Sequence, residues 1–250
     1  MPKELLEQNA DGLPLYRMVK QRILDSLAVG EWVSSQTLPS QSELCRRYNV
    51  SIGTLRKAVD ELVQERILLR KAGLGTFIAP HESGPMLFHF FNIVGRDGEK
   101  RMPVSRLQSF SLSRAPAKIA ERLHLKPGAP VYRIENVRMI DNEPALHDTL
   151  YVDCERFPGM AREDFENREG TIYSFYLARY GVNIIRTVES IAATACPAAV
   201  AKRLVIANQA PVLEMTRVAL TYHDVPIEYR ISYMSTLKHV YVNDQGKSRR

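Results

Sequence analysis

The first third of the chain carries hydrophobic residues at helical spacing in three successive segments. A first helix, opened by Pro14 and ended at Gly30, is predicted by Leu15, Val19, Ile23 and Leu27, which repeat every four residues. A second helix is predicted from Ser40, which forms a capping box with Glu43, and a third from Ser51. Two short hydrophobic runs then flank the turn of residues 72–75, and this pattern predicts a β-hairpin.

The third predicted helix has one hydrophobic face and one face of small and basic residues. Gly53 and Thr54 allow close approach to another surface, while Arg56 and Lys57 can reach phosphates or base edges in the DNA major groove. A helical subdomain with a solvated basic face is the alternative. The order helix, turn, helix, basic strand, Gly-x-Gly and strand favours a winged DNA-binding domain. The residues expected to contact DNA are Ser40, Gln41, Ser42, Ser51, Gly53, Thr54, Arg56, Lys57, Lys71, Gly73, Leu74 and Gly75.

The second part of the chain contains an internal repeat. The segment Ala115–Ile140 aligns with the segment Cys196–Thr221 at a constant offset of 81 residues. Each copy has the pattern of a short helix opened by proline, a long strand and a second strand, Leu146–Val152 or Glu228–Met234. Two such copies predict a pseudo-symmetric antiparallel sheet with helices on one side, an α+β domain. A nucleotide-binding Rossmann fold is excluded, because no βαβ alternation with a glycine fingerprint occurs.

Charged residues fall on otherwise hydrophobic faces of these predicted strands. Asn136 and Arg138 share a face with Ile134, and Arg217 is in the same situation in the second copy. An arginine on such a face needs an anionic partner, because a buried charge without one is costly. That partner is either a carboxylate of the protein or a carboxylate or phosphate of a ligand.

Three further features are open to two interpretations each. Glu228, Arg230 and Ser232 share one face of the last long strand, and the pattern alone favours a solvent-facing surface over a lined cavity. Thr171 is placed to cap a helix, whose free amides either hold an anion or are simply capped. His89 alternates with aromatic residues and faces either a cavity or the hydrophobic core.

Charge and cysteine usage narrow the functional class. The net charge of +6 and the pI near 9.2 suit a polyanionic partner. Residues 40–71 carry seven Lys and Arg against four Asp and Glu, so we expect salt-sensitive DNA binding. Three scattered cysteines favour a reducing, cytoplasmic environment without disulfides. Neither a signal peptide nor a membrane span is evident, and we expect no metal and no cofactor.

The motifs of the first part resemble a known family. LPSQSEL, NVSIGTLRKAVDEL and KAGLGTFI, within residues 14–79, are similar to the winged helix-turn-helix of GntR-family bacterial transcription regulators. The resemblance implies sequence-specific binding of double-stranded DNA. Ser42 and Ile52 stand where the family commonly has base-reading arginines, Arg56 matches a retained basic position, and Leu74 occupies a wing tip that is usually basic. The family's usual operator therefore does not follow from the resemblance.

The second part, from Phe88 to about Asn243, resembles the UTRA effector-binding domain of the HutC-type branch, which is related in fold to chorismate lyase. The segments that carry this resemblance are VYRIENVRMI, DNEPALHDTLYV, GTIYSFYLARYG and PIEYRISY. It implies effector contacts from Arg138, Asp148, Thr171, Tyr173 and Glu228. Asn136 replaces an arginine that often grips phosphate in the family, so we expect a carboxylate or another small polar metabolite rather than a sugar phosphate. Two more residues complete the set of candidate effector contacts: His89, and Arg230 as a further positive charge.

We therefore expect an α+β regulator with a ligand-responsive second domain. The expected organisation is a leader over 1–12, a winged helix-turn-helix over 13–79, a linker over 80–86, a UTRA-like effector-binding and dimerisation domain over 87–243 and a tail over 244–250. Its expected role is that of a repressor acting as a homodimer on a pseudo-palindromic operator. An enzyme with a chorismate-lyase-like domain acting on a small carboxylate is the alternative, disfavoured because HExxH, GxSxG and a motif-placed Cys–His pair are absent. A metal-sensing regulator is disfavoured by the strand-rich repeat.

Overall fold

The computed structural model of the protein describes residues 13–33, 36–65, 67–79, 92–168 and 170–242. The chain divides into two compact units, Met1–Ser83 with Tyr222–Asp224, and Gly84–Thr221 with Val225–Arg250. The expected leader, linker and tail lie outside the described residues, and so does His89.

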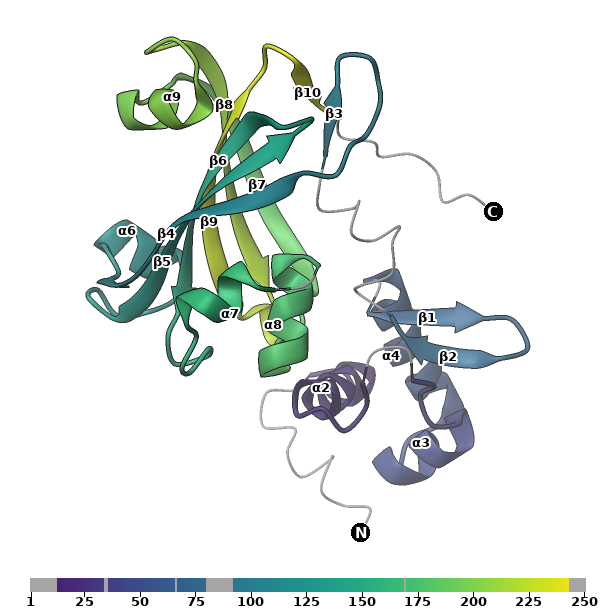
Figure 1. Cartoon of the computed structure of the whole chain (residues 1–250). Coiled ribbons are helices and arrows are strands. Elements are labelled where there is room, and N and C mark those ends of the chain that lie inside the picture. The colour runs from purple at the N-terminus through teal and green to yellow at the C-terminus, as the bar shows by residue number, and fades with distance from the viewer. Residues whose placement is uncertain (1–12, 34–35, 66, 80–91, 169, 243–250) are drawn as a thin grey trace. The chain divides into compact units, whose positions relative to one another are not determined.

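The first unit consists of three helices and a two-stranded hairpin (Figure 1). Its elements are α2 (Leu15–Ala28), α3 (Gln41–Tyr48), α4 (Ile52–Gln64), β1 (Leu68–Lys71) and β2 (Gly75–Ile78). Helices α2 and α4 bury Val19 and Ile23 together with Leu55 and Leu62, as helical spacing predicts. The three predicted helices and the predicted hairpin are confirmed.

Local side-chain bonds set where α3 and α4 begin. The backbone N–H of Glu43 donates to Ser40 Oγ at 3.3 Å, and the backbone N–H of Ser40 donates to Glu43 Oε2 at 2.8 Å, which completes the predicted capping box. Asn49 ends α3 in the left-handed region, with φ of 49°. Two residues later Ser51 Oγ accepts from the backbone N–H of Thr54 at 3.2 Å and opens α4.

The second unit is built on a six-stranded antiparallel sheet with the order β4-β5-β6-β9-β8-β7. Its strands are β4 (Val104–Arg114), β5 (Pro130–Ile140), β6 (Glu143–Asp153), β7 (Arg186–Ala195), β8 (Pro211–Leu220) and β9 (Pro226–Ser235), and a separate ribbon pairs β3 (Ile93–Gly95) with β10 (His239–Tyr241). Its helices are α6 (Ala117–Arg122), α7 (Arg162–Glu166), α8 (Ile172–Tyr180) and α9 (Ala198–Leu204). A 3-10 turn, η2 (Tyr222–Asp224), lies between β8 and β9 in sequence and is grouped with the first unit. The sheet order confirms the internal repeat, since β4-α6-β5-β6 and β7-α9-β8-β9 meet at the β6–β9 pair.

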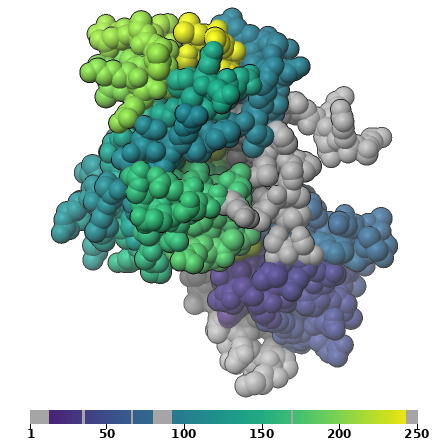
Figure 2. All heavy atoms as spheres, in the orientation of Figure 1, coloured from purple at the N-terminus to yellow at the C-terminus, as the bar shows by residue number. Residues whose placement is uncertain are grey.

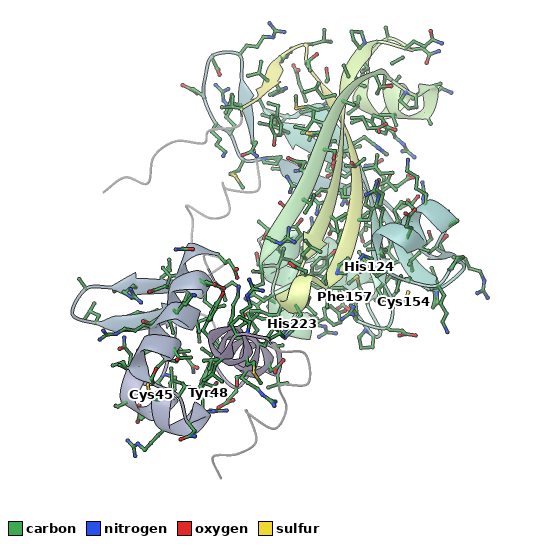
Figure 3. The ribbon with its side chains drawn as sticks, turned by 180° about the vertical axis from the view of Figure 1, so that it is seen from behind. Cys45, Tyr48, His124, Cys154, Phe157 and His223 are labelled. Atoms are coloured by element: carbon green, nitrogen blue, oxygen red, sulfur yellow. The ribbon has the colours of Figure 1, made fainter. Side chains whose placement is uncertain are left out.

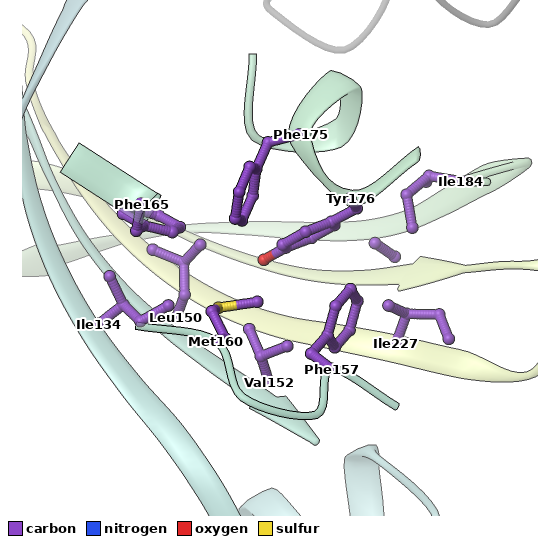
Figure 4. Close-up of a cluster of buried hydrophobic side chains, with 11 residues drawn as sticks. Ile134, Leu150, Val152, Phe157, Met160, Phe165, Phe175, Tyr176, Ile184 and Ile227 are labelled. Carbon is purple, nitrogen blue, oxygen red and sulfur yellow. The ribbon is translucent and has the colours of Figure 1, made fainter. Parts of the chain in front are cut away.

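The two faces of the sheet bury different groups. Helices α6 and α9 of the two copies pack on one face, against Tyr229 and Tyr233 respectively. The opposite face carries Ile134 and Leu150 and is covered by α7 and α8, whose Phe165, Phe175 and Tyr176 form an aromatic cluster over it (Figure 4). The predicted helices of the repeat therefore share one side, and the insertion between the copies covers the other.

Candidate DNA-binding surface and effector site

The exposed side of α4 carries the residues predicted for the major groove. Ile52 is 50 % exposed at the start of the helix, and Gly53, Arg56 and Lys57 are exposed as well. Arg56 Nε donates to Gln41 Oε1 at 3.2 Å and so links the two helices of the helix-turn-helix. Because exposed guanidinium N–H groups can bond both phosphates and guanine edges, this side of α4 can bind DNA.

The hairpin presents a narrow, exposed tip, which projects from its unit (Figure 2). Gly73 and Gly75 adopt φ of 74° and 112°, in the region that favours glycine, and Leu74 between them is 69 % exposed. The ammonium group of Lys71 lies 4.7 Å from the centroid of the Phe77 ring. The tip can therefore enter a groove with an apolar side chain flanked by backbone.

The remaining predicted DNA contacts lie at the starts of α3 and α4. Ser40 and Ser51 are caps, and the hydroxyls of Ser40 and Ser42 are 3.0 Å apart. Lys57 Nζ lies 4.0 Å from the centroid of the Tyr16 ring of α2, which holds its charge near the first helix. All twelve predicted residues thus belong to the α3–α4 pair or to the hairpin of one unit.

In the second unit, polar side chains form a row across the centre of the sheet. Strand register sets Asn136 of β5 opposite Asp148 of β6, and Asp148 opposite Ser232 of β9. Glu228 is 0 % and Arg230 is 6 % exposed, on the same face of β9 as Ser232. The interpretation of this polar face as solvent-facing is wrong, because α8 covers it and the hydroxyl of Tyr176 donates to Glu228 Oε2 at 2.8 Å.

Arg138 has a carboxylate of the protein as its partner. Its Nε donates to Asp148 Oδ2 at 2.6 Å and its Nη2 to Asp148 Oδ1 at 2.8 Å, and Ser232 Oγ donates to Oδ1 at 2.5 Å. Burial alone would raise the pKa of Asp148, but Arg138, Arg230 and these hydrogen bonds lower that pKa to about 2. The internal alternative for the Arg138 partner is therefore the one observed.

Two more arginines, one buried and one partly buried, follow the same rule. Arg217 and Arg230 lie directly opposite each other on β8 and β9, where like charges destabilise a sheet. Each is neutralised: Arg230 Nη2 bonds Glu228 Oε1 at 2.6 Å, and Arg217 Nη2 bonds Glu189 Oε1 at 2.8 Å. This face of the sheet thus holds three arginines and three matching carboxylates.

Thr171 and Tyr173 lie at the first turn of α8. The backbone N–H of Ser174 donates to Thr171 Oγ1 at 3.1 Å, and that of Thr171 donates to Ser174 Oγ at 3.0 Å, a reciprocal cap. The Tyr173 ring centroid lies 5.6 Å from the guanidinium carbon of Arg230, and burial raises the pKa of Tyr173. Arg138, Asp148, Thr171, Tyr173, Glu228 and Arg230 therefore lie on or against one face of the sheet.

Sequence reasoning missed two polar residues on this side of the sheet. Arg168 precedes α8, donates from Nη1 to the backbone carbonyl of Phe165 and lies 4.4 Å from the Phe165 ring centroid. Asn136 is fully buried; the sequence pattern places it on the face of Ile134 and Arg138, but it is not among the expected effector contacts. The available signal for Arg168 was its position just before the Gly170-Thr171 helix start.

Other chemistry finds little support in the described part of the chain. No group of three His, Cys, Asp or Glu side chains there could hold a metal ion. The free thiols of Cys45 and Cys154 belong to different units (Figure 3). None of the helices described is both long and apolar enough to cross a membrane.

Comparison with known proteins identifies both units. Residues 15–78 match the model of the bacterial regulatory proteins of the gntR family, and residues 98–239, more than half of the chain, match the UTRA domain. A protein of Escherichia coli named "probable fructoselysine utilization operon transcriptional repressor" is 27 % identical over 215 residues, 85 % of this chain and 87 % of that protein. The histidine utilization repressor of Pseudomonas putida is 28 % identical over 171 residues, 68 % of this chain and 69 % of that protein.

Comparison with solved structures gives the same family. The ligand-binding domain of a Bordetella bronchiseptica protein assigned to the GntR-family transcriptional regulators superposes with a TM-score of 0.61 and 26 % identity, over 63 % of this chain and 98 % of that one. YydK of Bacillus subtilis has the same fold along 94 % of this chain and all of its own, with a TM-score of 0.54 and 16 % identity. The chain therefore belongs to the bacterial GntR family, in the HutC-type branch with a C-terminal UTRA domain, and is a ligand-responsive, DNA-binding transcription regulator rather than an enzyme.

Proposed function

We propose that the chain is a cytoplasmic, homodimeric repressor, and that a small carboxylate bound in its second unit releases it from a pseudo-palindromic operator. The DNA-binding domain would cover residues 13–79, and the effector-binding and dimerisation domain residues 87–243. Contacts to DNA come from the exposed side of α4 and from the hairpin tip, two per dimer and spaced to match two half-sites.

One observation carries the effector site: six charged side chains, three of them buried and three partly buried, lie on a single sheet face. Burying an ion costs several kcal/mol, and well-packed hydrophobic residues usually stabilise a core as well as ion pairs do. Such a cluster is therefore better explained by ligand recognition than by stability. Arg138, Asp148, Glu228 and Arg230 are the members that overlap the expected effector contacts.

The names of two relatives support a carboxylate. One is named for the use of fructoselysine and the other for the use of histidine, and both compounds carry an amino-acid carboxylate. Both relatives are named as repressors, which supports the same sign of regulation here. Ligand binding can weaken DNA binding only if the ligand prefers the conformation with lower DNA affinity.

A thermal-shift screen of the full chain against carboxylates, amino acids and sugar phosphates tests the effector half of this proposal. A ligand at 100 times its dissociation constant adds about 2.7 kcal/mol to the free energy of unfolding. We expect a carboxylate to produce this shift in the wild type and in the Arg106→Lys control on the exposed side of β4. Arg138→Lys, which loses the bidentate geometry but keeps the charge, should reduce it. Shifts by sugar phosphates alone would contradict a carboxylate effector.

The DNA half is tested with duplexes selected by the protein from a random-sequence pool. We expect Arg56→Ala to weaken binding to the selected duplex about tenfold or more, because a base or phosphate contact by arginine contributes roughly 1–3 kcal/mol. Arg106→Ala removes the same charge from the other unit and should leave the affinity nearly unchanged. An Arg56→Ala protein with full affinity would remove α4 from the interface.

A further inference from the structure

The buried and partly buried charged side chains on the α8-covered face form three ion pairs, and Arg168 is not part of them. Arg138, Arg217 and Arg230 each have a carboxylate partner. Within the described residues, no carboxylate pairs with Arg168, and its buried Nε has no hydrogen-bond partner. The Arg168 guanidinium contacts an aromatic ring and one carbonyl among the described groups, and one of its N–H groups is unused there. A ligand with a single negative charge would neutralise this cation and accept from that N–H.

Asn136 is the second unmatched group on this face. Its side chain is 0 % exposed, and in the described part of the chain both Nδ2 and Oδ1 lack a hydrogen-bond partner. Asp148, directly opposite, bonds Arg138 and Ser232, and as a carboxylate it has no donor for Asn136 Oδ1. A buried amide with neither its donor nor its acceptor satisfied is costly, so its retention indicates a ligand that supplies both.

The two groups lie on the same side of the sheet and are linked by one hydrophobic cluster. Ile134 and Leu150 form the next same-face pair after Asn136 and Asp148, and both belong to the cluster that contains Phe165. Arg168 lies on that Phe165 ring, and the charge of Arg230, together with burial, lowers the pKa of Arg168. A small molecule between α8 and the sheet could therefore contact Arg168 and Asn136 together.

We infer that the effector is a small monocarboxylate whose uncharged end presents a hydrogen-bond donor and an acceptor side by side, as a primary carboxamide does. Arg168 binds the carboxylate, and the Asn136 amide pairs with the neutral donor–acceptor edge through two hydrogen bonds. This inference rests on the proposed effector site and narrows its ligand class. A dicarboxylate or phosphate ester would bring two negative charges to one uncompensated cation and would leave the Asn136 donor and acceptor poorly matched.

Calorimetric titration of the full chain with matched ligands tests this inference. The probes are the ω-amido acids succinamate, glutaramate and adipamate, each compared with its diacid, its diamide and the plain monoacid of equal length. We expect at least one amido acid to bind about 10–100 times more tightly than its three counterparts, since each lacks one of the two interactions or adds a charge.

Two variants test which residue binds each end of the ligand. Arg168→Gln should remove the preference for the amido acid over the diamide, because the carboxylate loses its cation. Asn136→Leu should remove the preference for the amido acid over the plain acid. Asn136→Leu should also raise the melting temperature without ligand by roughly 2–4 °C, because it replaces an unsatisfied buried amide with an apolar side chain. A structural role for the amide would lower that temperature and overturn the inference.

The outcomes separate this inference from the proposed function. If diacids or phosphate esters bind and the amido acids do not, the ligand class is overturned while the effector site stands. If no amido acid binds and neither variant alters the binding of any carboxylate found in the thermal-shift screen, the inference fails. If Arg138→Lys is also without effect on that carboxylate, the proposed effector site fails with it.

Discussion

At the scale of single residues, the two copies of the repeat place opposite chemistry at equivalent positions. The offset of 82 in the second strands relates Asp148 to Arg230, and the offset of 81 in the first strands relates Asn136 to Arg217. The facing pair Asn136–Asp148 thus corresponds to the facing pair Arg217–Arg230. Each half nevertheless balances its charges, since Asp148 pairs with Arg138 in one copy and Arg217 and Arg230 pair with Glu189 and Glu228 in the other.

Asp148→Asn is expected to lower the free energy of unfolding by roughly 3 kcal/mol at pH 7, because it removes the buried carboxylate that pairs with the partly buried Arg138. The pKa of Asp148 falls from 3.8 to about 2 on folding, so its carboxylate stabilises the protein above pH 4. That stabilisation is lost as the pH falls from about 4 to 2. Urea unfolding of both proteins across this range should show their difference shrinking in acid. A difference independent of pH would contradict the role of the charge.

Sequence pattern predicted which of these residues share a face but not what covers it. Strand alternation placed Glu228, Arg230 and Ser232 together. Whether that face meets solvent depends on α8, which lies more than 40 residues away in sequence. For the same reason, the sequence could not show that, among the described residues, Arg168 lacks a carboxylate partner and Asn136 lacks a hydrogen-bond partner. That conclusion requires the partner of every neighbouring carboxylate, which only the structure gives.

At the scale of elements, local sequence signals predicted where most helices and the hairpin turn lie. The pairing of strands β3 and β10, which are far apart in the sequence, was missed. The caps at Ser40 and Ser51 and the glycine turn of the hairpin depend on bonds within a few residues, so the sequence contains them in full. The β3–β10 ribbon pairs Ile93 with Tyr241, and no local pattern indicated it. Repeat alignment did indicate the β6–β9 symmetry, because both copies retain the same spacing.

The β3–β10 ribbon is joined to the charged face through Tyr241. Its hydroxyl donates to Glu189 Oε2 at 2.5 Å and accepts from Asn92 Nδ2 at 3.0 Å, and Glu189 holds Arg217. Asn92 follows residues 80–91, which connect the two units in sequence. We expect Tyr241→Phe to change ligand affinity less than threefold but to weaken ligand-induced release of DNA. Tyr151→Phe, on the other face of the sheet, is the control. Unaltered release in Tyr241→Phe would show that this path does not couple the sites.

At the scale of the whole molecule, charge and ligand act on DNA binding in different ways. The net charge of +6 draws the protein to any DNA, and this attraction weakens as salt displaces counterions. A small ligand barely alters the total charge, so its effect must pass through the conformation that the protein adopts. The ligand response should therefore persist at salt concentrations that abolish non-specific binding.

Thermodynamic linkage allows the coupling between ligand binding and operator binding to be measured from either side. If the ligand lowers operator affinity by a given factor, saturating operator must lower ligand affinity by the same factor, because both paths join the same four states. We expect a factor of about 5–150, the usual range for coupling of 1–3 kcal/mol. Calorimetric titration of ligand with and without the selected duplex gives one ratio, and fluorescence anisotropy of the duplex with and without ligand gives the other. A duplex of scrambled sequence, bound only through charge, should leave ligand affinity unchanged.

Unequal ratios at one protein concentration would mean that a further equilibrium, such as dimer dissociation, accompanies release. Repeating both titrations at several protein concentrations would then identify that equilibrium.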